Sequence, residues 1–252
     1  MESVRDRPPW VDVAESYEAM SQRAAERWIA CAAEAMDQRG RFTVAVSGGS
    51  TPRRLYEILA SPEDQARMDW TRTDVFWTDE RIVPADDPDS NYRLVQTTLL
   101  AHVPIPSSNI HRVRTELGAA EAAEAYEREI RACFNIAVAQ WPRFDLLILG
   151  VGEDGHTASL FPGSPALQER TRIAVATPHG SLPPSVDRVT LTLPVLNAAR
   201  NAVFLASGAA KARILQGALG GDPTIPAALV RPTDGTLYWL LDTAAAGAGA
   251  GR

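Results

Sequence analysis

Three segments of the chain share one order, in which an apolar run is followed by a turn rich in glycine and then by a helical pattern. The apolar runs lie at residues 41–46, 144–149 and 202–206 of the 252-residue sequence. Continuous apolar runs of this length are typical of strands that are covered on both faces, as in parallel sheets. We therefore expect an α/β fold whose three glycine-rich turns lie at the carboxyl edge of a mostly parallel sheet, where such sheets bind ligands.

Further elements fit this architecture. The segments TDVFWTDE (residues 73–80) and TLYWLLD (residues 236–242) are rich in aromatic and β-branched residues and predict two more strands. Alanine and charged residues at helical spacing predict helices over residues 16–38 and 118–134. We expect a single α/β domain over residues 1–242, followed by a flexible tail of small residues, TAAAGAGAGR, from 243 to 252.

Charge and apolar content restrict the partners. The formal net charge is −6 and 45% of the residues are hydrophobic, which disfavours a nucleic-acid-binding surface and is ordinary for a soluble globular protein. No apolar run approaches the ~18 residues of a membrane span. The first ten residues, MESVRDRPPW, carry charges and prolines instead of the apolar core of a signal peptide. We expect a cytoplasmic protein without nucleic-acid or membrane partners, either a monomer or a weak dimer.

The first glycine-rich turn, SGGSTP, has the composition of an anion site. Gly48 and Gly49 allow the backbone to approach a ligand closely, and Thr51 before Pro52 is typical of a capped helix start. Free amides at such a start bind phosphate, assisted here by the hydroxyls of Ser50 and Thr51. Because neither a Walker loop nor a GxGxxG fingerprint is present, a tight strand-to-helix connection explains this turn equally well.

Polar candidates follow in later segments. Asp79 and Arg81 end a predicted strand, and Asn91 opens a helical pattern after a loop rich in proline and aspartate. The planar guanidinium of Arg81 suits a phosphate or a developing oxyanion. Arg188 precedes a strand-like alternation, and Lys211 lies in the first turn of a helix, where its charge opposes the helix dipole unless an anion binds there. Each residue alone fits a solvated surface position, but together they indicate a site for an anionic small molecule.

The segment GVGEDGHTAS follows the second apolar run and contains the most informative histidine. Histidine changes charge near neutral pH, which suits His156 to acid–base chemistry. Asp154, two residues earlier, is placed to orient the ring or to act as a second acid–base group. A loop histidine without a function is the alternative interpretation.

No metal or disulfide site is predicted. The four histidines, at positions 102, 111, 156 and 179, show no HExxH or similar ligand spacing. Cys31 and Cys133 lack CxxC spacing and lie in helical patterns, so we expect both in the core.

Five segments together resemble the 6-phosphogluconolactonases. They are, in order, SGGSTP, WTDERIVPADDPDSNYRL, LGVGEDGHTASLFPGSPAL, RVTLTLPVLNAA and SGAAKA, and the likeness spans roughly residues 20–242. The resemblance implies a three-layer α/β/α fold with a Rossmann-like sheet of the glucosamine-6-phosphate deaminase type. It also implies hydrolysis of 6-phospho-D-glucono-1,5-lactone to 6-phospho-D-gluconate, in the oxidative branch of the pentose phosphate pathway, without a cofactor or a metal.

Two other functions stay open at this point. Amino-sugar-phosphate isomerases/deaminases share the Gly-Gly and Asp-Gly-His elements, but they resemble IAFNEP after the histidine, whereas this chain reads TASLFP with Leu160 and Phe161. The missing carboxylate favours the lactonase. A non-catalytic sugar-phosphate-binding domain is the second alternative, although no DNA-binding module accompanies it in the sequence. A serine hydrolase is disfavoured because no GxSxG motif is present.

The resemblance leads to a hypothesis for the site. His156 acts as general base toward water and then returns the proton to the ring oxygen, oriented by either Asp154 or Asp79. The oxyanion is met by Arg81 or by amides of the GVG turn. The expected catalytic residues are His156, Asp154, Arg81 and Asp79, and the expected substrate and phosphate contacts are Gly48, Gly49, Ser50, Thr51, Asn91, Arg188 and Lys211.

Overall fold

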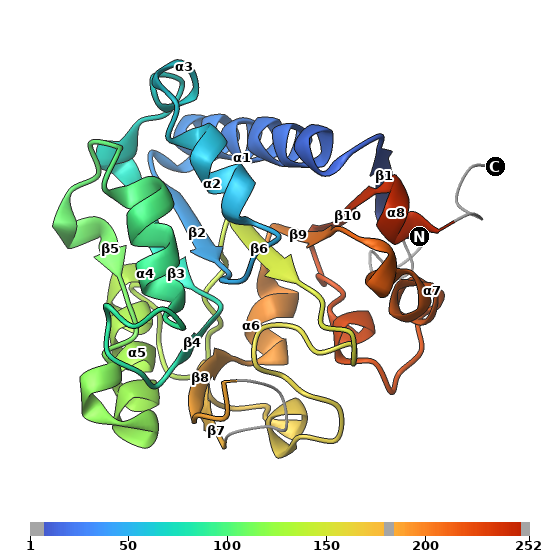
Figure 1. Ribbon diagram of the computed structural model, residues 1–252. Helices are drawn as coiled ribbons and strands as arrows, with labels where there is room; N and C mark the ends of the chain where they lie inside the picture. The colour runs from blue at the N-terminus through green and yellow to red at the C-terminus, as the bar shows by residue number, and fades with distance from the viewer. Residues whose placement is uncertain (1–7, 179–183, 248–252) are drawn as a thin grey trace.

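The computed structural model describes residues 8–178 and 184–247, and its centre is a seven-stranded parallel sheet (Figure 1). The strand order is β1-β10-β9-β6-β2-β3-β5, and every neighbouring pair runs parallel. The expected α/β fold class is therefore confirmed. The strands are β1 (Trp10–Ala14), β2 (Phe42–Val46), β3 (Thr73–Trp77), β5 (Ile110–His111), β6 (Leu146–Gly150), β9 (Asn201–Ala206) and β10 (Thr236–Asp242).

Helices cover both faces of this sheet. In Figure 1, α1 lies along one side, and α5 and α6 lie along the other. One core holds buried side chains of α1 (Tyr17–Arg39), α2 (Arg53–Leu59) and α4 (Asn91–Val95). The opposite core holds those of α5 (Ala119–Phe134), α6 (Leu193–Ala198) and α7 (Ala212–Gly220). The two cores give three layers, with the sheet in the middle.

Successive side chains of the central strands enter opposite cores. In β2, Val44 and Val46 lie in the core under α1, whereas Ala45 lies in the core under α5. In β6, Ile148 and Leu149 divide in the same way. Because both faces of the strand are buried, every position must be apolar, and this produces the continuous runs in the sequence.

A second sheet is antiparallel and was not expected. It contains β4 (Asp79–Arg81), β8 (Arg188–Leu191) and β7 (Ala174–Thr177), in that order. Strand β4 continues from β3 after a single residue, so the chain passes from one sheet into the other at the carboxyl edge. Arg188 is consequently the first residue of a strand and does not precede it, and its side chain is buried.

Two predicted helix starts differ from the structure. Thr51 is not a cap, because α2 begins at Arg53 after Pro52, and no side chain caps its first amides. After the third glycine-rich turn, Ala209–Lys211 form one 3-10 turn, and α7 begins only at Ala212. In both segments the α-helix therefore begins later in the chain than the sequence suggests.

The expected tail is ordered at its start. Thr243–Ala246 form a short helix, α8, in which the Asp242 carboxylate accepts a hydrogen bond from the Ala245 amide at 2.7 Å. Ala245 is fully buried, so this part of the segment packs against the domain and is not a flexible tail. Residues 248–252 of the expected tail, and His179, lie outside the described residues.

The two cysteines differ in environment, and both are free. Cys31 belongs to α1 and is buried in the core, as expected. Cys133 packs against the other core, as expected, but it is only partly buried, and its sulfur lies 3.0 Å from an Arg41 nitrogen. None of the helices in the described ranges is both long and apolar enough to cross a lipid bilayer.

Candidate active site

The three glycine-rich turns meet at the carboxyl edge of the sheet and line one cleft of about 380 Å³. Ten of the eleven residues expected from the sequence line it, and the exception, Asp154, contacts a lining residue. The ten are Gly48, Gly49, Ser50, Thr51, Asp79, Arg81, Asn91, His156, Arg188 and Lys211.

His156 and Asp154 form a close pair at this cleft. The Nδ1 atom of His156 lies 2.5 Å from Oδ1 of Asp154, which also accepts the His156 backbone N–H at 3.1 Å. The ring packs against Phe161 with its centroid 4.7 Å away. Nε2 has no hydrogen-bond partner among the described residues. This pairing places the proton on Nδ1 and leaves Nε2 as an acceptor for a water molecule.

Gly152 makes room for this pair. A Cβ atom at position 152 would lie 2.1 Å from Nδ1 of His156 and 2.5 Å from Oδ1 of Asp154. The Gly152 amide also donates to the carbonyl oxygen of His156 at 2.8 Å, which closes the turn. Any larger residue would therefore push the histidine or the aspartate out of position.

Asp79 lies in the same cleft but contacts neither His156 nor Asp154. Its carboxylate accepts the Ser159 hydroxyl at 2.6 Å, and its carbonyl oxygen accepts the Asn91 side-chain amide at 2.9 Å. Of the two carboxylates that the sequence left open, it is Asp154 that contacts the histidine ring. Asp79 instead connects the segment after His156 to the start of α4.

Glu80 fixes the start of α4 and was not expected as a site residue. It is 1% exposed and accepts hydrogen bonds from the amides of Arg81, Asn91 and Tyr92 at 2.6–2.8 Å. Burial raises the pKa of Glu80, and these amides act in the opposite direction. The anchored Asn91 packs so closely on the first glycine-rich turn that a Cβ at Gly48 would lie 1.7 Å from its Oδ1.

The first glycine-rich turn presents unpaired amides. The N–H groups of residues 48–51 donate to no acceptor among the described residues. Gly49 has a φ of 90°, which a side chain would disfavour. Tyr17 donates to two carbonyl oxygens of this turn at 3.0 and 3.1 Å, and Tyr56 donates to the Ser47 carbonyl at 2.7 Å. The tyrosines thus hold the carbonyl groups, while the amides stay available for an anion.

Two arginines supply positive charge. Arg81 and Arg188 are paired across β4 and β8, and the Nε atom of each is buried without a hydrogen-bond partner. Burial lowers the pKa of Arg188, and the neighbouring Arg81 charge lowers it further. The guanidinium groups donate to carbonyl oxygens, Arg81 to that of Asp89 at 2.6 Å and Arg188 to that of Pro184 at 3.3 Å. Among the described residues, neither arginine forms an ion pair, and this favours an anionic ligand.

The third turn adds a lysine and a serine. Lys211 forms no ion pair with a described carboxylate and follows Gly208, whose φ is 91°. The Ser207 hydroxyl donates to the Asp242 carboxylate at 2.5 Å, which fastens this turn to the end of β10. Ser207 and Ser47 line the cleft but were missed, although each directly follows a central strand. That position was the available signal, because ligands bind beyond the carboxyl ends of parallel strands.

One group with metal-ligand spacing occurs among the described residues, and it lies outside this cleft. It consists of Asp74, His111 and Cys133, whose ligand atoms all lie within 4.8 Å of one another. The linear spacing of the histidines gave no sign of it, because the three residues come from separate elements.

Comparisons with known proteins identify the family. The model of the glucosamine-6-phosphate isomerases/6-phosphogluconolactonase family matches residues 15–239. The chain belongs to this family. It is 45% identical over 236 residues to the 6-phosphogluconolactonase of Homo sapiens, covering 90% of this chain and 87% of that protein. The 6-phosphogluconolactonase of Synechocystis sp. is 40% identical over 242 residues, covering 93% of this chain and 95% of that protein.

Solved structures of this family have the same fold. The 6-phosphogluconolactonase of Trypanosoma brucei matches with a TM-score of 0.84 and 30% identity, covering 94% of this chain and 97% of that one. A monomeric glucosamine-6-phosphate deaminase matches with a TM-score of 0.79 over 94% of this chain and 98% of that one, at 18% identity, and shows the shared fold alone. The expected resemblance to the lactonases and to the deaminase fold is therefore confirmed.

Proposed function

We propose that this chain hydrolyses 6-phospho-D-glucono-1,5-lactone to 6-phospho-D-gluconate, the lactonase step in the oxidative branch of the pentose phosphate pathway. The observation that carries the proposal is the position of His156. Its Nδ1 contacts Asp154, and its Nε2 belongs to a cleft whose turn amides and two arginine Nε atoms have no partner among the described residues. These groups suit a lactone that carries a phosphate, because they combine a base with one region for the phosphate charge and another for a developing oxyanion.

His156 acts first as general base. Nε2 takes a proton from the water molecule that attacks the lactone carbonyl carbon, and the resulting imidazolium is stabilised by Asp154 on Nδ1. The carbonyl oxygen of the tetrahedral intermediate carries the negative charge. When the bond from this carbon to the ring oxygen breaks, Nε2 returns the proton to that oxygen. General acid–base catalysis of this kind contributes about 10²–10⁴-fold to the rate.

Arg81 meets the developing oxyanion, and the glycine-rich turn meets the phosphate. The amides of residues 48–51 donate to no acceptor within residues 8–178 and 184–247, and Lys211 and Arg188 add positive charge to the same cleft. The phosphate binds before the reaction and stays unchanged, so its contacts hold the lactone against His156. Such positioning reduces the entropic part of the barrier.

Asp79 and Asn91 are positioning residues in this account. Asp79 holds the segment after His156 through Ser159 and holds α4 through Asn91. The buried Asn91 presses against Gly48 and thereby limits the shape of the phosphate turn. Together they link the segment after the catalytic histidine to the phosphate turn, Asp79 by hydrogen bonds to Ser159 and Asn91, and Asn91 by packing on Gly48.

The side chains after His156 favour the lactonase over the deaminase. Leu160 is fully buried in the core, and Phe161 packs on the His156 ring. Neither position offers the carboxylate that a deaminase uses after the shared histidine. These apolar side chains beside the His156 ring suit an enzyme in which His156 is the single acid–base group at this position.

A two-substrate assay tests the function. The lactone is generated in situ, and its disappearance is followed with and without the protein, after subtraction of spontaneous hydrolysis. The same preparation is incubated with glucosamine 6-phosphate, and released ammonia is measured. We expect faster lactone loss and no ammonia. Ammonia release without faster lactone loss would assign the deaminase function instead, and inactivity toward both with retained binding of 6-phosphogluconate would indicate a binding domain.

We place this activity in the cytoplasm. Cys31 and Cys133 are both free, which is typical of a reducing compartment. Fractionation of the source cells should recover the lactonase activity of this chain in the cytosolic fraction, and recovery in an exported or organellar fraction would contradict this placement.

A further inference from the structure

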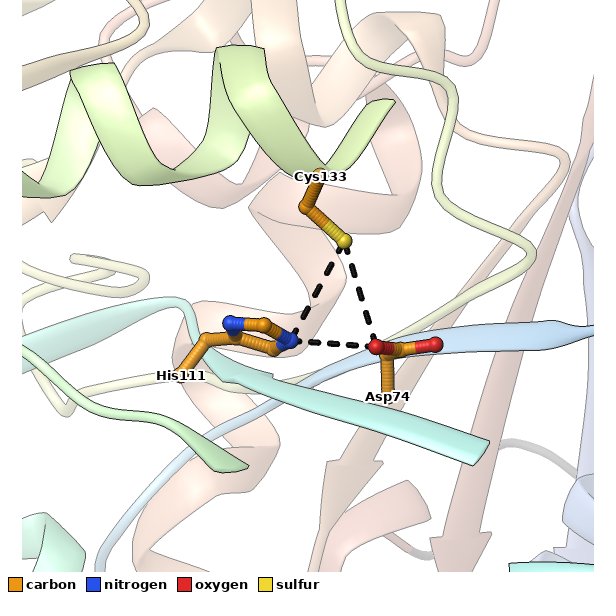
Figure 2. Close-up of side chains that lie close together, drawn as sticks. All are labelled: Asp74, His111 and Cys133. Carbon is orange, nitrogen blue, oxygen red and sulfur yellow. Dashed lines mark hydrogen bonds and ion pairs between the residues drawn. The ribbon is translucent and has the colours of Figure 1, made fainter. Parts of the chain in front are cut away.

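A second polar cluster lies outside the cleft, where β3, β5 and α5 meet. Asp74 is the second residue of β3, His111 ends β5, and Cys133 lies in the last turn of α5. Figure 2 shows the three side chains pointing toward one another from these elements. Oδ1 of Asp74 lies 3.0 Å from Nε2 of His111 and 3.9 Å from the Cys133 sulfur, and the sulfur lies 4.0 Å from Nε2.

These separations fit a tetrahedral zinc site. With zinc bonds of about 2.0–2.3 Å, neighbouring ligand atoms lie roughly 3.3–3.8 Å apart. The observed distances of 3.0, 3.9 and 4.0 Å bracket that range, so shifts of a few tenths of an ångström bring the three atoms around one ion. A thiolate, an imidazole and a carboxylate together favour Zn²⁺ over Mg²⁺ or Ca²⁺, which prefer oxygen ligands alone.

The surroundings hold the ligands in this orientation. Nδ1 of His111 lies 2.9 Å from the Glu129 carboxylate, so Nε2 is directed at Asp74 and Cys133. The ring stacks on Phe76 at 4.3 Å between centroids. Arg41 donates to Oδ2 of Asp74 at 2.6 Å and leaves Oδ1 toward the other two ligands. A carboxylate behind the histidine and a donor behind the aspartate are the usual supports of metal ligands.

Charge balance allows an ion to enter. Without metal, the His111 ring lies between the Asp74 and Glu129 carboxylates, and the Arg41 cation lies beside Asp74. Zn²⁺ binds a thiolate and a neutral imidazole, so binding releases the protons that these ligands carry and offsets the charge of the ion. Arg41 also contacts the sulfur at 3.0 Å, but its side chain is 41% exposed and can release that contact toward solvent.

We propose that Asp74, His111 and Cys133 form a zinc-binding site with a water molecule as the fourth ligand. Bound zinc joins β3, β5 and α5 and stabilises the fold. The site takes no part in lactone hydrolysis, because none of its three residues lines the cleft that contains His156 and Arg81.

A cobalt titration tests the site independently of activity. The metal-free protein is titrated with Co²⁺, whose bond to a thiolate gives a charge-transfer band in the near ultraviolet, and Zn²⁺ is then added to displace it. We expect one band, which Zn²⁺ removes. Cys133→Ser should abolish it, and His111→Gln should weaken binding at least about tenfold. Cobalt bound in the cleft near His156 would give no such band, because no cysteine lines that cleft.

Matched controls make the result decisive. Cys31→Ser should leave the band intact, because burial raises the pKa of the Cys31 thiol to about 12 and withholds the thiolate. His102→Gln changes an exposed histidine outside the cluster. Thermal unfolding shows whether each variant is folded. If His111→Gln does not fold, the loss of the band in Cys133→Ser tests the site alone. Absence of the band, or a band that survives Cys133→Ser, would overturn the proposal.

Discussion

Arg81 and Arg188 are direct partners across the antiparallel strands β4 and β8, so that two guanidinium groups share one side of the cleft. The Nε atoms of both are buried and have no hydrogen-bond partner in the part of the chain that the structure describes. Two like charges held in this way destabilise the fold unless an anion lies between or beside them. The pair therefore indicates that the fold is arranged for a charged substrate or a charged transition state.

Arg81→Gln should reduce activity without reducing stability. Removal of one cation relieves the repulsion on Arg188, whose pKa is lowered by burial and by Arg81. We expect an unchanged or higher Tm and a kcat lower by about 10²–10³-fold, the usual effect of losing one oxyanion contact. The exposed Arg128 provides the control, since Arg128→Gln should change neither value. An Arg81→Gln enzyme with normal kcat would remove Arg81 from the chemistry.

Gly152→Ala should disturb the catalytic pair selectively. The new methyl group would lie 2.1 Å from Nδ1 of His156, so the ring must move. Misplacement of a catalytic group by about 1 Å costs up to roughly 10²-fold in rate. We expect a fall in kcat of this order, measured by steady-state kinetics. Gly220→Ala is the control, because a Cβ there meets no atom within 4 Å. Equal kinetics for the two variants would contradict the packing argument.

Asp154→Asn tests how the histidine is held. The carboxylate accepts a hydrogen bond from Nδ1, whereas an amide nitrogen at the same place would donate and favour the tautomer protonated on Nε2. We expect kcat to fall by at least about tenfold with KM nearly unchanged, because the phosphate contacts remain. The pH dependence of kcat should also change. A rise in KM with normal kcat would assign Asp154 to substrate binding instead.

Glu169 should contribute stability that is lost in acid. Hydrogen bonds from the Thr171 amide and hydroxyl lower the pKa of Glu169 to about 2, and the amides of Arg172 and Arg170 act in the same direction. A lowered pKa stabilises the fold above the ordinary value of 4.5, and the contribution disappears as the pH falls through 2. The difference in unfolding free energy between the wild type and Glu169→Gln should therefore shrink over this interval. Denaturant titrations at several pH values measure it, and a constant difference would contradict the account.

The central strands and the ligand edge could be predicted because they follow from local pattern. Burial on both faces requires the apolar runs of β2, β6 and β9, and the glycines mark the turns that follow. Parallel strands place these turns at one edge of the sheet. The sequence alone therefore sufficed to predict that the ten cleft residues lie together.

The remaining features depend on contacts between distant segments. Strand β1 was missed because it is a short edge strand, and Trp10 is 69% exposed, so the segment lacks the pattern of burial. Strands β4, β7 and β8 have three or four residues each and are defined by their pairing. The choice of Asp154 over Asp79 as the partner of His156 required side-chain positions. The Asp74, His111 and Cys133 cluster arises only when two strands and a helix meet.

Hydrolysis of in situ generated 6-phosphogluconolactone by the wild type, His156→Gln and His102→Gln tests the central claim most directly. His102 is an exposed histidine whose ring contacts only the Thr97 carbonyl among the described residues, so its replacement controls for the substitution itself. We predict that the wild type and His102→Gln accelerate lactone loss equally, and that His156→Gln lowers kcat by about 10²–10⁴-fold with an unchanged Tm. Near-normal kcat for His156→Gln would contradict the account and would require another base in the cleft.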